Sequence, residues 1–97
     1  MHVISYKRIR EFVKEHPDAG VKLGKWYKWM KKGKFKNLNE IKRKFPEVDY
    51  IGNDRYVFNV SGNKYRLVAV VILSTKIVLI RFIGTHGEYD KINAYKI

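Results

Sequence analysis

The run from Leu67 to Leu73 is apolar at every position, and no other feature restricts the fold as much. It lies within a longer stretch, Tyr56 to Asp90, where three runs rich in Val, Ile, Tyr and Phe are separated by Ser61-Gly62-Asn63 and Ser74-Thr75. Short turn-type breaks between β-branched runs predict two consecutive hairpins. A strand without polar positions has both faces at least partly covered, so we expect this one at the centre of the sheet.

Basic residues interrupt this apolar stretch near one end of the predicted sheet. A two-residue loop at Ser74-Thr75 would pair Arg66 with Ile83, and side-chain alternation then places Lys64, Arg66 and Arg81 on one face. Such a cluster costs stability unless it stays hydrated or meets anions. A solvated sheet end and an anion site are therefore both consistent with the pattern.

The chain is small, strongly basic and free of cysteine. Its 97 residues suffice for one domain, residues 1–97, and the absence of cysteine excludes disulfides and thiolate chemistry. The three histidines show no ligand spacing, so we expect neither a metal nor a cofactor. No signal peptide or membrane span is visible, which predicts a cytoplasmic protein without a membrane partner.

The net charge of +12 is concentrated between Lys22 and Lys44, where ten basic residues accompany one acid, Glu40. A field of that sign attracts polyanions. RNA, DNA, an anionic membrane surface and an acidic protein all carry the required charge, and a nucleic acid is our first expectation.

Helical periodicity dominates the first third of the chain. Two segments, one ending at Pro17 and one from about Asp18 to Lys32, place apolar residues at i, i+3, i+4 and i+7. The second stripe consists of Leu23, Trp26, Tyr27 and Met30. We predict an α+β fold: two N-terminal helices packed on a small antiparallel sheet of three to four strands, one of them an edge strand at Met1–Ile4, with a short C-terminal helical turn at Glu88 to about Asn93.

Several enzyme classes are excluded by missing motifs: there is no Gly-rich phosphate loop, serine nucleophile elbow or H-E-x-x-H zinc motif. Metal-free RNA cleavage needs only a proton donor or acceptor and cations that stabilise the phosphorane. Histidine changes charge near neutral pH, and His86 follows the last predicted strand. Arg66 offers a bidentate fork for phosphate oxygens, and Tyr89 a hydroxyl or a stacking ring.

The motifs YVFNVSGNKYRLVAVV and IRFIGTHGEYDKI resemble those of HigB-type toxins of type II toxin–antitoxin modules, a branch of the RelE/ParE superfamily. The resemblance is strong from Tyr56 to about Ile92 and weaker over the helices. It implies a RelE-like fold and an mRNA interferase that acts without a metal, often at the ribosome. It also implies a helix-turn-helix antitoxin of the HigA type.

By position, the resemblance implies that Arg66 binds phosphate and that His86 is catalytic, with Tyr89 and Asp90 less firmly matched. We further expect five residues to contact RNA: Lys34, Lys36, Asn59, Lys64 and Arg81. Two other functions fit the same residues. One is an RNA- or ribosome-binding protein that does not cleave, and the other is a gyrase inhibitor of the ParE type.

Overall fold

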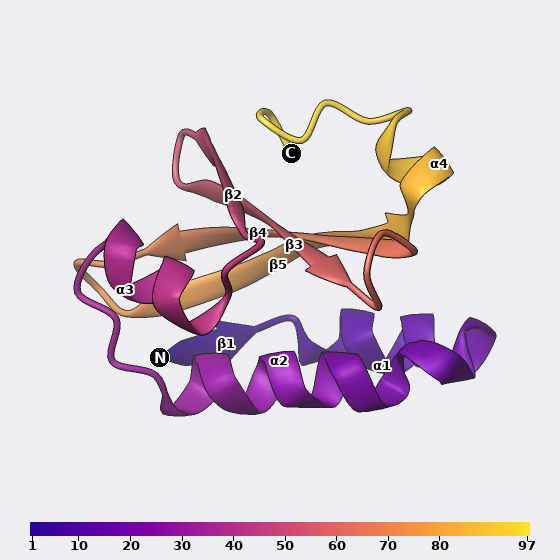
Figure 1. The fold of residues 1–97 in the computed structure, drawn as a ribbon, viewed down its shortest axis with the longest axis horizontal. Coiled ribbons are helices and arrows are strands. Elements are labelled where there is room, and N and C mark those ends of the chain that lie inside the picture. The colour runs from indigo at the N-terminus through magenta and orange to yellow at the C-terminus, as the bar shows by residue number, and fades with distance from the viewer.

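The computed structural model describes residues 1–97 as one sheet with helices on both faces (Figure 1). The elements follow in the order β1 (His2–Ile4), α1 (Tyr6–Glu15), the 3₁₀ turn η1 (Pro17–Ala19), α2 (Gly20–Lys32), α3 (Leu38–Lys44), β2 (Asp49–Gly52), β3 (Arg55–Val60), β4 (Tyr65–Ile72), β5 (Ile77–Thr85) and α4 (His86–Tyr89). None of the helices combines the length and the apolar character needed to cross a bilayer.

Strand β4 holds the central place in the strand order β1-β5-β4-β3-β2, as its apolar run predicts. All positions from Leu67 to Val71 are buried. Alternate residues face opposite sides, since Leu67, Ala69 and Val71 join the large core under the helices while Val68 joins a smaller core on the other face.

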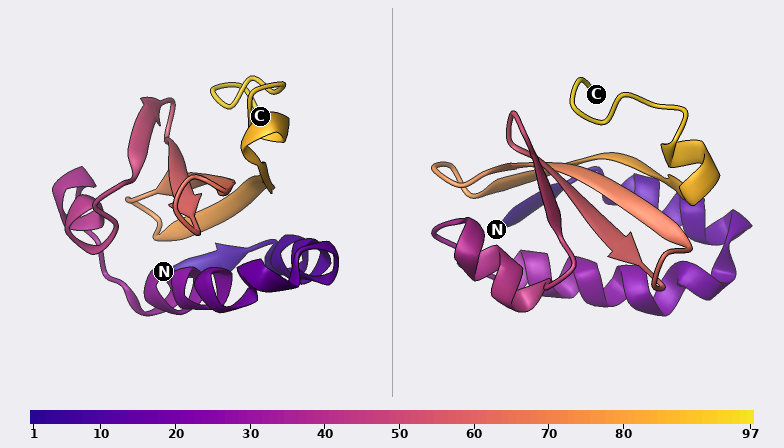
Figure 2. Two further views of the ribbon diagram at one scale, coloured as in Figure 1. Left: turned by 45° about the vertical axis from the view of Figure 1, so that its right-hand side comes forward. Right: turned by 45° about the horizontal axis from the view of Figure 1, so that its top comes forward.

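The two long helices cover one face of the sheet, as predicted (Figure 2). The stripe on α2 is confirmed, because Leu23, Trp26 and Met30 are all buried in the large core. The lysines of α2 occupy its exposed side, so the charged and the apolar residues lie on opposite faces of the helix.

The sheet is larger and less regular than the predicted one. It has five strands rather than three to four, and it is mixed rather than antiparallel, because β1 pairs with β5 in parallel register from His2↔Ile77 to Ile4↔Leu79. β2 is the strand that the sequence did not indicate. Alternation of apolar residues identifies a strand but carries no information on its direction, so the edge position of β1 was predictable and its orientation was not.

A β-bulge changes the register of the β4–β5 hairpin. The pairing runs regularly from Ile72↔Ile77 to Ala69↔Ile80 and then shifts, so that Val68 faces Phe82. Arg81 is the extra residue of this bulge and is exposed. The predicted pair of Arg66 with Ile83 is therefore wrong: Arg66 faces Gly84.

The second sheet face is covered by α4 and the C-terminal segment (Figure 1). Val57, Val68 and Ala94 form a small core there, and half-buried Phe82 and Tyr89 pack against it. The expected C-terminal helical turn is present but begins at His86 instead of Glu88. This segment places α4 beside the ends of β4 and β5, where the predicted site lies.

Candidate active site

Three strands bring polar residues into one row near the end of the sheet. Asn59 on β3 pairs with Arg66 on β4, and Arg66 pairs with Gly84 on β5. His86 follows two residues after Gly84, at the first position of α4. The register therefore gathers Asn59, Arg66 and His86 within one sheet end, although they are spread over 28 positions of the sequence (86 − 59 + 1 = 28).

Arg66 is half-buried and faces the C-terminal side of the sheet. Its neighbours Tyr65 and Leu67 join the core under the helices, so alternation directs Arg66 to the side that carries α4. The guanidinium makes one long hydrogen bond, from Nη1 to the Tyr65 carbonyl at 3.4 Å. The two ion pairs in the structure join other residues, so no carboxylate neutralises Arg66. A guanidinium without a carboxylate partner can bind an anion such as phosphate.

A capping box fixes the start of α4 directly after β5. The Thr85 hydroxyl accepts from the Glu88 N–H at 3.2 Å, and the Glu88 carboxylate accepts from the Thr85 N–H at 2.8 Å. These two hydrogen bonds hold the pKa of Glu88 below its usual range, and the one from the Thr85 backbone N–H has the larger effect. The His86 N–H also donates to the Lys64 carbonyl at 3.2 Å, which joins α4 to the β3–β4 turn.

The His86 ring lies against a carboxylate on the same short helix. Its Nδ1 is 3.1 Å from Oδ2 of Asp90, and both side chains are more than half exposed. A carboxylate on Nδ1 fixes the ring orientation and leaves Nε2 available for a substrate. Tyr89 turns its ring toward Phe82, with 6.4 Å between ring centroids, and is half-buried.

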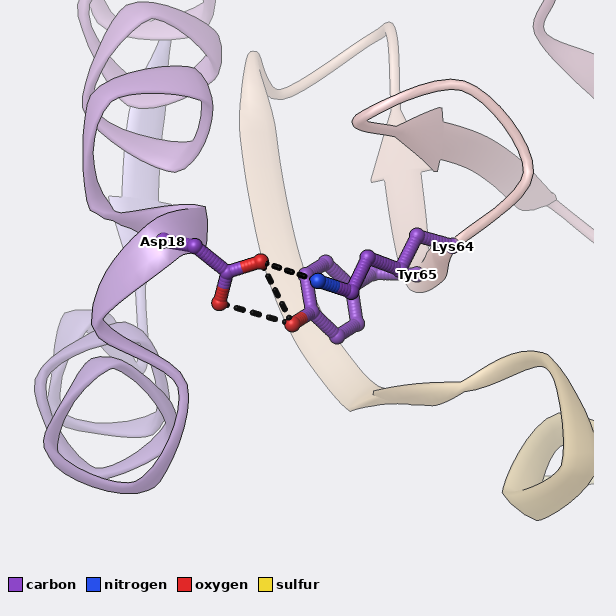
Figure 3. Close-up of polar contacts among 3 residues, drawn as sticks. All are labelled: Asp18, Lys64 and Tyr65. Atoms are coloured by element: carbon purple, nitrogen blue, oxygen red, sulfur yellow. Dashed lines mark hydrogen bonds and ion pairs between the residues drawn. The ribbon is translucent and has the colours of Figure 1, made fainter.

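Figure 3 shows a second polar group beside this end of the sheet, formed by Asp18, Lys64 and Tyr65. The Asp18 carboxylate accepts from the buried Tyr65 hydroxyl at 2.8 and 3.0 Å and pairs with the Lys64 ammonium. The hydrogen bond from Lys64, followed by that from Tyr65, lowers the pKa of Asp18, and the same carboxylate raises the pKa of Lys64. Burial, and then Asp18, raise the pKa of Tyr65. This group ties η1 to the β3–β4 turn.

We expect Asp18→Asn to lower stability at pH 7 and to lower it less at pH 3. The folded pKa of Asp18 lies below the ordinary value of about 3.9, so its stabilisation is present above that value and is lost as pH falls through the lower folded pKa. The loss is small because the pair is half exposed.

Urea unfolding at the two pH values measures this difference. Glu15→Gln is the matched control, since Glu15 is exposed on α1 and forms no ion pair. An equal loss for Asp18→Asn at both pH values would show that the charge of Asp18 has no part in stability.

The structure does not bring every expected RNA contact to this site. Lys64 contributes its carbonyl, but its ammonium turns to Asp18 on the helical side, so the prediction that Lys64 shares a face with Arg66 is wrong. Lys34 and Lys36 flank Phe35, whose carbonyl accepts from Lys76 at the opposite end of β4 and β5. That end is roughly 20 Å away at about 3.3 Å per residue. Arg81 lies between the two ends, in the bulge.

Two features of the site were missed by the sequence interpretation. The capping box was visible as Thr85 followed three residues later by Glu88, and it would have placed the helix start correctly. The Asp18 contacts had no local signal, because Asp18 and Lys64 are 46 positions apart.

No group of three or more His, Cys, Asp or Glu side chains lies together in a way that could hold a metal ion.

The sequence is similar to known proteins over a range that includes all residues of the candidate site. A family described as "HigB_toxin, RelE-like toxic component of a toxin-antitoxin system" matches residues 19–92. The mRNA interferase toxin HigB of Escherichia coli (strain K12) is 36% identical over 93 residues, or 93% of this chain and 88% of that protein. The mRNA interferase HigB of Shigella flexneri matches to the same extent. That of Escherichia coli O6:H1 is 31% identical over 97 residues, or 98% of this chain and 94% of the relative.

Proposed function

The chain belongs to the HigB family, the RelE-like toxic components of toxin–antitoxin systems, and we propose that it cleaves mRNA by metal-independent attack of a ribose 2′-hydroxyl. The family and its named mRNA interferases establish the toxin class and the cleavage of mRNA. The observation that supports the chemical route is that Arg66 and the start of α4, which is His86, lie at the same end of the sheet.

The reaction needs two proton transfers and one charged intermediate. The 2′-hydroxyl loses its proton to a water molecule and its oxygen attacks the adjacent phosphorus. The bond to the 5′-oxygen breaks, and the products carry a 2′,3′-cyclic phosphate and a 5′-hydroxyl. The Arg66 guanidinium binds two phosphate oxygens and stabilises the phosphorane, where the negative charge increases. His86 gives a proton to the departing 5′-oxygen through Nε2, while Asp90 holds the ring at Nδ1.

Two further residues complete the proposed site. Asn59, which pairs with Arg66, presents an amide that can hydrogen-bond to a base edge or to a ribose. Tyr89 is held by its contact with Phe82 and offers its hydroxyl beside His86 on the same helix. These residues define where the scissile nucleotide would lie.

The partners follow from the same proposal. We propose that this toxin acts on mRNA bound to the ribosome, in the cytoplasm, and that a helix-turn-helix antitoxin of the HigA type inhibits it. The net charge of +12 supports a ribosome-bound state, because it favours association with RNA in a salt-dependent way.

The test is to map the ends of RNA cut by the purified protein, on free RNA with and without EDTA and on mRNA bound to ribosomes. We expect 5′-hydroxyl ends, no loss of free-RNA cleavage in EDTA, and no cut at a site that carries a single 2′-deoxy nucleotide. Free 5′-phosphate ends would contradict the proposal, because they require attack by water or hydroxide in place of the 2′-oxygen.

A further inference from the structure

A cleft of about 360 Å³ opens at the edge of the sheet, outside the candidate active site. It lies between α2, the end of α3 with the segment that follows it, and the end of β3. We call it the tryptophan cleft, and its walls include Lys22, Lys25, Trp26, Trp29, Phe45 and Phe58. A space of this size is large enough for one small planar group and too small for a helix or strand of a partner protein.

Aromatic side chains form the floor of the tryptophan cleft. The rings of Trp26 and Phe58 meet edge to face, with 5.5 Å between their centroids. The centroid of the Phe45 ring lies 5.8 Å from that of Trp29 and 5.1 Å from that of Phe58. Trp29 is 38% exposed, which is unusual for so large an apolar side chain. The indole N–H of Trp26, which lines the cleft, is buried and has no hydrogen-bond acceptor in the protein.

The rim of the cleft is positively charged. Lys22, Lys25 and Lys44 line it together with a single acid, Glu47, and none of the three lysines belongs to an ion pair. The Lys44 ammonium lies over the Trp29 ring, 4.2 Å from its centroid. Such a cation–π contact is weak at an exposed site. A phosphate group that binds the Lys44 ammonium can therefore displace it from the Trp29 ring, and the ring can then stack on a base.

Part of β3 has an unpaired edge in this cleft. Pairs between β2 and β3 end at Asp49↔Val57, whereas pairs between β3 and β4 continue to Val60↔Tyr65. Residues 58–60 therefore have a strand on one side only, and alternate backbone N–H and C=O groups face outward. An edge of three residues is too short to pair stably with a strand from a partner protein. Its free backbone N–H and C=O groups can instead form hydrogen bonds with the edge of a single base.

The cleft and the candidate active site meet at Asn59 but open on opposite faces of the sheet, because Phe58 and Val60 join the core under the helices while alternation directs Arg66 to the other face. Asn59 and Ser61 line the cleft, and Asn59 pairs across the sheet with Arg66. An RNA strand that leaves Arg66 and passes around the free edge of β3 at residues 58–60 therefore reaches the cleft. The combination of a cationic rim with aromatic rings is the arrangement that proteins use for single-stranded nucleic acids.

We propose that the tryptophan cleft binds one unpaired nucleotide of the RNA substrate that flanks the scissile phosphate. Its base stacks on Trp29, and its phosphates contact Lys22, Lys25 and Lys44. This inference rests on the proposed function for the identity of the ligand, and it assigns the basic charge of α2 to substrate binding.

Intrinsic fluorescence tests the proposal directly, because Trp26 and Trp29 are the only tryptophans in the chain and both line the cleft. The probe is a twelve-nucleotide single-stranded RNA that is fully 2′-O-methylated and therefore resists 2′-hydroxyl attack. We expect it to quench the fluorescence, with affinity roughly tenfold lower for Trp29→Leu. Trp29→Leu keeps an apolar side chain at this half-exposed position, and circular dichroism checks its folding.

Lysine variants separate a specific site from general charge. Lys22→Ala with Lys25→Ala removes two rim cations, whereas Lys28→Ala with Lys32→Ala removes two exposed lysines of α2 that do not line the cleft. The first pair should reduce the slope of log affinity against log salt by about 1.4 units, and the second pair should leave it unchanged. Equal effects of the two pairs, or binding without quenching, would overturn the proposal.

Cleavage assays keep this inference distinct from the proposed function. With a short RNA substrate, the rim variants should raise KM and leave kcat near the wild-type value, because the cleft holds a flanking nucleotide. Cleavage at wild-type KM by Trp29→Leu would remove the cleft from substrate binding while leaving the nuclease function intact. Quenching by the purified antitoxin but not by the RNA probe would assign the cleft to a protein partner instead.

Discussion

Replacing Arg66 with alanine is expected to slow RNA cleavage about 10²- to 10³-fold, the usual loss when one donor to a developing anion is removed. The guanidinium has no carboxylate partner, so its loss leaves no uncompensated charge and the fold should persist. Arg66→Lys keeps the charge but not the bidentate fork and should recover only part of the rate. The measurement is the single-turnover rate on saturating RNA.

Arg10→Ala provides the control for a lost positive charge, since Arg10 is exposed on α1, the helix that packs on the other face of the sheet. His86→Ala should lower the same rate about 10²- to 10⁴-fold, and the double variant should be much less than additive, because both residues act on one step. If Arg66→Ala and Arg10→Ala cleave equally fast, Arg66 does not bind the reacting phosphate. Induced expression gives the same comparison in cells, where the inactive variants should no longer arrest growth.

The second large effect concerns stability. We expect Leu67→Ala to lower the free energy of unfolding by about 2–5 kcal/mol, because Leu67 is fully buried on the central strand and its removal leaves a cavity that neighbouring strands cannot close. For a domain with a total stability of about 5–15 kcal/mol, such a loss leaves a sizeable unfolded fraction. Urea unfolding followed by tryptophan fluorescence measures it.

Leu79→Ala is the matched comparison, because it makes the same chemical change on β5 at a position that is only half-buried. Its loss should be less than half that of Leu67→Ala. Similar values for the two variants would mean that the sheet centre contributes no more than its periphery.

Local periodicity predicted the parts of this fold that depend on one segment at a time. The uniform apolar run made β4 central, and the spacing of Leu23, Trp26 and Met30 gave the buried face of α2. The parallel direction of β1 and the bulge at Arg81 were not predictable, because each is decided by pairing between distant segments. The bulge matters for function, since it places Gly84 rather than Ile83 beside Arg66.

The candidate site divides in the same way. The motifs around Arg66 and His86 indicated the family, and the family match confirms that part. Their roles as phosphate ligand and proton donor stay predictions, as do those of Asn59 and Tyr89. The Asp18 contacts and the tryptophan cleft depend on how α2, α3 and β3 pack together, and no single stretch of sequence encodes that arrangement.

The parallel pairing of β1 with β5 has a consequence for how the toxin is made. Residues 2–4 are synthesised well before their strand partner, residues 77–79, so the sheet stays incomplete until that partner has left the ribosome. His86 is translated later still. A growing chain therefore cannot complete the candidate site beside the message that encodes it until α4 has also left the ribosome.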